Sequence, residues 1–78
     1  LDLGRNSLFF ISSSIFRKLT NLQNLLLDNN EISDIGVDAF SDLGNLFELV
    51  LDENSLTNIR NDTFQNLTSL VFLDIRNN

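Results

Sequence analysis

The sequence predicts a repeat solenoid, a coil of similar units whose strands form one parallel sheet. The first observation is that an asparagine recurs every 24 residues, and the second is that apolar residues keep step with it. A repeat of roughly 20 to 29 residues with leucines in fixed places is a strong signal, because many independent positions must agree. The asparagine column is Asn6, Asn30, Asn54 and Asn78, and the apolar columns are Leu1/Leu25/Leu49/Leu73, Leu3/Leu27/Leu51/Ile75, Leu8/Ile32/Leu56, Ile11/Ile35/Ile59, Phe16/Phe40/Phe64, Leu19/Leu43/Leu67 and Leu22/Leu46/Leu70.

The first element of each unit is a short strand. From Leu22 to Leu27 the side chains are expected to alternate between the two faces of a strand, with Leu25 and Leu27 toward the core. Equivalent strands begin at Leu46 and Leu70, and a truncated one at Leu1. Because the chain reaches each strand after a full turn of the coil in the same direction, neighbouring strands must pair in parallel.

The second element is the return segment, such as Ser33 to Asn45, along the outer side of the coil. It takes more space than a strand does, so we expect the stack to bend with the sheet on its concave face. Each phenylalanine of the column Phe16, Phe40 and Phe64 is expected to stack on the next as a filler between the sheet and the outer side. A cofactor-binding aromatic box is the alternative, but a periodic aromatic is usually part of a core.

The asparagine column lies where each strand turns inward, at a buried corner in which backbone groups have no ladder partner. An amide can donate and accept hydrogen bonds there at the same time. We therefore expect a structural asparagine ladder of Asn6, Asn30, Asn54 and Asn78.

These residues resemble the leucine-rich repeat family, and the pattern LxxLxLxxNxLxxIxxxxFxxLxx is similar to its typical 24-residue class. The resemblance implies the α/β class, with a right-handed leucine-rich repeat solenoid, a parallel concave β-sheet and a mostly irregular convex side. It also implies an extracellular setting, secreted or in the ectodomain of a membrane protein. Many members place a proline after the outer Ile/Leu, where this chain has Ser12, Gly36 and Arg60, so the resemblance specifies the outer side less closely than the sheet.

The repeats divide the chain into a single array. We expect a partial repeat over residues 1–21, full repeats over 22–45 and 46–69, and a partial repeat over 70–78, with no capping modules. This organisation predicts a fragment of a longer ectodomain, because a natural array ends in capping units with a polar outer surface.

Composition excludes several classes of function. Five basic and eleven acidic residues give a formal charge of −6, the wrong sign for a nucleic-acid partner. His, Cys, Tyr, Trp and Met are absent, which removes nucleophile pairs, zinc sets and imidazole bases, so we expect no enzyme and no cofactor. No apolar stretch of about eighteen residues is present, so a membrane is expected only through parts of the parent protein outside these residues.

Three acids recur every four residues, at Asp34, Asp38 and Asp42, and could suggest a cation site. A solvated outer surface is the better interpretation, since calcium needs more oxygen ligands in a tighter loop. We therefore expect no metal. Two sequons, Asn61-Asp62-Thr63 and Asn66-Leu67-Thr68, make Asn61 and Asn66 possible N-glycosylation sites away from the sheet.

The solvent-facing positions of the sheet are the best candidates for function. They combine acids with apolar side chains, and an apolar patch rimmed with charge is typical of protein-binding surfaces. The partner is therefore expected to be a protein with a basic and apolar surface. The alternative is that Val, Leu and Phe are there because they suit strands. The partner-binding candidates are Asn24, Leu26, Asp28, Phe47, Glu48, Val50, Asp52, Phe72, Asp74 and Arg76.

The sequence thus favours a protein-recognition segment of an extracellular receptor, adhesion or matrix protein that acts without catalysis. Two alternatives remain open. One is an architectural or dimerisation stretch, and the other is a repeat arm of a larger extracellular enzyme. Fold alone does not decide among the three.

Overall fold

The computed structural model describes all residues, 1–78, and contains five short strands and no helix. The strands are β1 (Phe10–Ile11), β2 (Asn24–Leu26), β3 (Asp34–Ile35), β4 (Glu48–Val50) and β5 (Phe72–Asp74). The α component of the expected α/β class is therefore absent. The outer segments instead form single turns, each closed by a hydrogen bond between residues three apart in the sequence. One example is the bond from the Ala39 N–H to the Gly36 carbonyl, and these turns do not continue into a helix.

The strands β2, β4 and β5 form one parallel sheet, as predicted. Its register places Leu25 opposite Leu49 and Leu49 opposite Leu73, which is one repeat length at each step. Asp2 joins the same sheet through a single bridge to Leu26. The strands begin two residues later than the sequence predicts, because residues such as Leu22 still close the preceding turn by donating to the Leu19 carbonyl.

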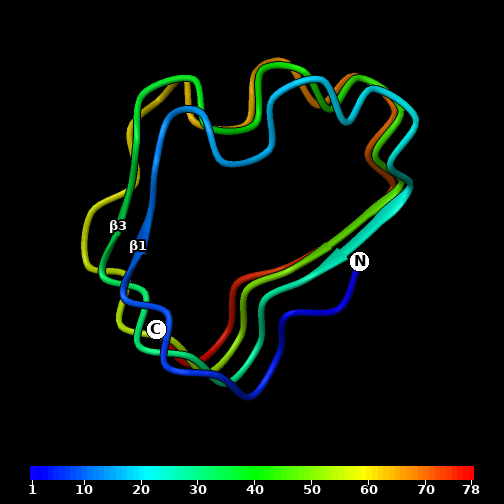
Figure 1. Cartoon of the computed structure of the whole chain (residues 1–78). Coiled ribbons are helices and arrows are strands. Elements are labelled where there is room, and N and C mark those ends of the chain that lie inside the picture. Colours follow the sequence, from blue (N-terminus) through cyan, green and yellow to red (C-terminus); the bar gives the residue numbers. More distant parts are fainter.

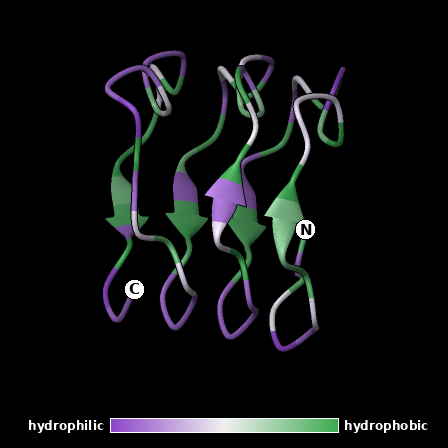
Figure 2. Cartoon of the chain, turned by 90° about the vertical axis from the view of Figure 1, so that its left-hand side faces the viewer, coloured by the Kyte–Doolittle hydropathy of each residue, from purple (hydrophilic) through white to green (hydrophobic).

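A second parallel sheet, of β1 and β3, was not predicted. It lies across the core from the first sheet, and the successive repeats overlay one another when the chain is viewed along the stack (Figure 1). The arrows of the two sheets run in opposite directions (Figure 2), since each repeat passes along one side and returns along the other.

The core fills the space between the sheets. Leu25, Leu27, Leu49 and Leu51 are fully buried. The rings of the phenylalanine column stack at 6.2 Å between centroids, with interplanar angles of 16° and 13°, so the predicted filler is confirmed. The same columns open to solvent at the ends of the stack, where the exposed members include Leu1, Leu19, Leu73 and Ile75.

A tight turn follows each strand of the first sheet. The residue before each ladder asparagine has a positive φ, with values of 58°, 53°, 54° and 56° at Arg5, Asn29, Glu53 and Asn77. This left-handed conformation is strained for most side chains and is tolerated best by Gly and Asn. The turn redirects the chain toward the core, and it brings the following asparagine side chain under the sheet edge.

Candidate functional site

The solvent-facing side of β2, β4 and β5, with the residues that flank it, contains the ten partner-binding candidates, and we call it the sheet face. Strand alternation produces it, because Leu25 and Leu49 point inward and their neighbours therefore point outward. The sheet face consists of Asn24, Leu26, Asp28, Phe47, Glu48, Val50, Asp52, Phe72, Asp74 and Arg76.

The apolar part of the sheet face lies at its centre and at the beginnings of the strands. Leu26 and Val50 are opposite each other in the strand register and are half-buried. Phe47 and Phe72 keep 52% and 47% of their surface exposed, and Val71 beside them keeps 73%. Together these large side chains form an exposed apolar patch. Such patches are typical of interaction sites in soluble proteins.

The acidic part lies where the strands end. Asp28 and Asp52 occupy the same position in successive repeats and are half-buried. Neither takes part in an ion pair. Glu48 accepts a hydrogen bond of 2.9 Å from the Asn24 amide, which neutralises no charge. The ends of β2 and β4 therefore have carboxylates without an ion-pair partner next to the apolar part of the sheet face.

Asp74 differs from the expectation that it is an open acid. Arg76 covers it, with Nε donating to one carboxylate oxygen at 3.0 Å and Nη2 to the other at 2.7 Å, and Asp74 is buried. The side-chain hydrogen bonds from Arg76, followed by the hydrogen bond from its backbone N–H, hold the pKa of Asp74 below its usual value. Opposite charges two residues apart at the end of a strand lie on the same side of the chain if the extended backbone continues, and that spacing is the signal from which this pair could have been predicted.

The asparagine column connects each repeat to the one before it. The Asn30 side-chain oxygen accepts from the N–H groups of Asn6 and Leu8, and its amide nitrogen donates to three carbonyl groups. The Asn54 oxygen accepts from the Ile32 N–H at 3.0 Å, and its nitrogen likewise donates to three carbonyl groups. Asn30 is buried and Asn54 is half-buried.

Two members of the column depart from the expected buried corner. Asn6 and Asn78 are exposed, because each lies at an end of the stack with a neighbouring repeat on one side only. Both still donate to carbonyl groups of their own turn. The sequon asparagines, Asn61 and Asn66, are exposed on the turn that carries residues 61–66, away from the sheet face.

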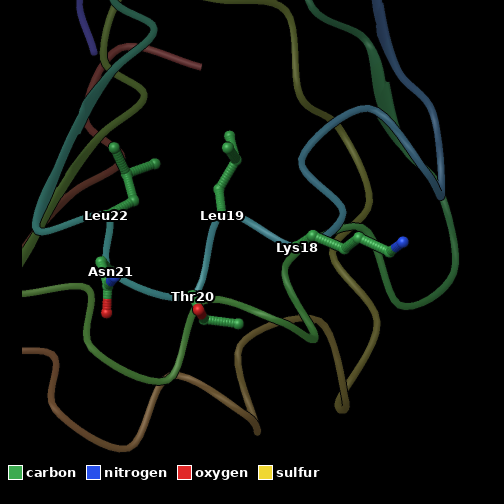
Figure 3. A pocket seen from close by; sticks show the side chains of 5 residues that line it. All are labelled: Lys18, Leu19, Thr20, Asn21 and Leu22. Carbon is green, nitrogen blue, oxygen red and sulfur yellow. The ribbon is translucent and has the colours of Figure 1, made fainter.

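The structure has two surface hollows. One, of about 360 Å³, is lined by Lys18, Leu19, Thr20, Asn21 and Leu22. The side chains of Leu19 and Leu22 point the same way there, opposite to that of Asn21 (Figure 3). Because the equivalent Leu43 and Leu46 are fully buried, this hollow is an open end of the core rather than a site of chemistry.

The other hollow, of about 310 Å³, adjoins the sheet face and is lined by Asp2, Gly4, Arg5, Leu26 and Asp28. No three carboxylates come together anywhere in the structure in a way that could hold a metal ion. The structure also has no helix long and apolar enough to cross a membrane.

A family model described as leucine rich repeat matches residues 20–78, which include β2, β3, β4 and β5. No curated protein matches the chain.

Proposed function

Because the chain belongs to the leucine-rich repeat family, whose domains generally mediate protein–protein interaction, we propose that it recognises a protein partner through the sheet face, without catalysis. The observation that carries the proposal is the composition of this face. Exposed Phe47 and Phe72 lie beside half-buried Leu26 and Val50, next to the unpaired acids Asp28 and Asp52. Such a surface favours a partner with apolar side chains and basic charge.

The wider setting is part of the same proposal. The repeats form a right-handed solenoid with the sheet face on its concave side, and the parent protein is an extracellular receptor, adhesion or matrix protein. The typical 24-residue repeat supports this setting. Glycans at Asn61 and Asn66 would then leave the sheet face open, since both residues are exposed away from it. A mass loss after glycosidase treatment of chain secreted from animal cells tests the glycans.

Peptide selection tests the binding proposal. A random twelve-residue peptide library is selected on the immobilised chain, and each selected peptide is then measured against variants. We expect the peptides to combine Lys or Arg with apolar residues, and Asp52→Lys to weaken their binding about tenfold while the melting temperature stays unchanged. Binding should also be faster at low salt, because the attraction is electrostatic.

Asp38→Lys is the matched control, because it reverses the same charge at an exposed position outside the sheet face. It should leave binding unchanged. Selected peptides without basic residues, or equal weakening by both variants, would exclude the sheet face as the recognition surface.

A further inference from the structure

The chain contains the same local arrangement twice, at the two ends of the sheet face. Asp2 and Gly4 lie three repeat lengths before Asp74 and Arg76, so the two pairs occupy equivalent positions. In both pairs the first residue accepts a hydrogen bond from the backbone N–H two residues later. The distances are 2.9 Å from Gly4 to Asp2 and 3.1 Å from Arg76 to Asp74.

At the second end the arrangement holds a guanidinium group. Arg76 donates to both carboxylate oxygens of Asp74. The side-chain hydrogen bonding to Asp74, and then the negative charge of Asp74, raise the pKa of Arg76. Asp52, one repeat earlier in the same column as Arg76, adds a smaller electrostatic contribution in the same direction. A planar guanidinium that donates to both oxygens of one carboxylate is a geometry that arginine satisfies particularly well.

At the first end the two carboxylates are present, but the position equivalent to Arg76 is a glycine. A Cβ placed on Gly4 would lie 2.5 Å from Asp28 Oδ1 and 3.2 Å from Asp2 Oδ1, so both oxygens converge on the space above the glycine. The backbone does not require glycine here, because its φ is not positive. Because glycine has no side chain, the space between the two carboxylates stays open as the hollow.

The chain does not fill this hollow with a cation of its own. Arg5 lines it but forms no ion pair with either acid. Leu26 forms an apolar wall on the side toward the rest of the sheet face. The hollow therefore offers two carboxylate oxygens for a charged head and an apolar surface for the stem that carries it.

We propose that the hollow of Asp2, Gly4 and Asp28 receives an arginine side chain of the protein partner, with its guanidinium placed as that of Arg76 is placed on Asp74. The proposal rests on the proposed function and names one residue type of the partner. The remaining partner surface then lies over Leu26 and Val50, which continue from the hollow along the sheet face.

Ethylguanidinium chloride, which carries the head group of arginine, is the probe. It is titrated into the full chain while the ¹H–¹⁵N signals are followed. We expect saturable shifts at Gly4, Arg5 and Asp28, and about tenfold weaker binding in Asp2→Asn, which keeps the acceptor for the Gly4 N–H but removes the charge. Gly4→Arg supplies an internal guanidinium and should abolish the shifts, whereas Asp38→Asn should leave them unchanged.

Sodium chloride and tetramethylammonium chloride at the same concentrations correct for ionic strength and for a cation without hydrogen-bond donors. Equal shifts with these salts, or saturation that survives in Gly4→Arg, would overturn the proposal. This test is separate from the peptide selection. If the peptides bind the sheet face but ethylguanidinium does not bind the hollow, the arginine pocket is wrong and the recognition face stands. If ethylguanidinium binds the hollow but no peptide binds the sheet face, the proposed function is wrong.

Discussion

The two sheets on opposite sides of the core differ in how far they continue. The first sheet keeps one pairing from Asp2 through β2 and β4 to β5, so it crosses every repeat. The second sheet consists of β1 and β3 and does not extend into the third repeat. The columns that support the first sheet each keep one residue type, leucine or asparagine, with a single isoleucine as the exception. The column at the end of the second sheet has a different residue type in every repeat.

That changing column is Ser12, Gly36 and Arg60. In the second repeat the Gly36 N–H donates to the Ile11 carbonyl at 2.6 Å, which continues the ladder beyond β3. One repeat further along, the equivalent carbonyl is that of Ile35, and it accepts instead from the side chain of Arg60 in the third repeat, with Nη2 at 2.9 Å. A side-chain donor thus replaces the backbone donor where the second sheet ends. The comparison teaches that backbone pairing continues from repeat to repeat where a column keeps one residue type. Where the residue type varies, the contacts between repeats differ from one repeat to the next.

Removing one ladder amide should give the larger effect in this comparison. Asn30→Leu removes the acceptor of two N–H groups and one side-chain donor to each of three carbonyl groups, so the free energy of unfolding should fall by about 1 to 3 kcal/mol. The midpoint of urea unfolding measures it, provided that the slope is unchanged. Asn6→Leu is the control, because Asn6 is exposed and its side chain serves only its own turn. Equal losses in the two variants would contradict a ladder that connects repeats.

Adding a side chain where β1 and β3 approach each other closely, in the second sheet, should lower the free energy of unfolding somewhat less. A Cβ on Gly36 would lie 2.7 Å from the backbone nitrogen of Ser13 and 3.0 Å from the Ile11 carbonyl oxygen, so the backbone must move. Gly36→Ala should lower the free energy of unfolding by about 1 to 2 kcal/mol. Gly44→Ala is the matched control, because a Cβ there meets nothing within 4 Å. If both glycines tolerate alanine equally, β1 and β3 do not approach each other as described.

The sequence predicted the regular part of the molecule well. The inward positions of Leu25 and Leu49, the parallel pairing and the phenylalanine stack all follow from columns of one residue type, since such a column has one environment. The open core at the ends also follows, because an end repeat has one neighbour. The parallel strands of the expected α/β class are present but its α part is absent, because the outer turns close locally and do not continue into helices.

The unpredicted features depend on single side chains and on backbone angles. Arg5 and Glu53 do not indicate a left-handed turn, yet both adopt one because the turn before the ladder asparagine requires it. Arg60 reaches the Ile35 carbonyl only because the backbone of the neighbouring repeat lies within its range. The covering of Asp74 by Arg76 could have been predicted from their spacing, but the open counterpart above Gly4 could not, because it requires the position of Asp28 in the next repeat.

Hydrogen exchange at the Ile32 amide tests most directly the claim that each repeat is held to the next by the asparagine column. The acceptor of this N–H is the side-chain oxygen of Asn54, in the following repeat. We expect the Ile32 amide to be protected in the unmodified chain and to exchange much faster in Asn54→Leu, while the Leu27 amide, bonded to the Val50 carbonyl, stays protected. An Ile32 amide that exchanges in the unmodified chain as fast as in an unstructured peptide would contradict the account.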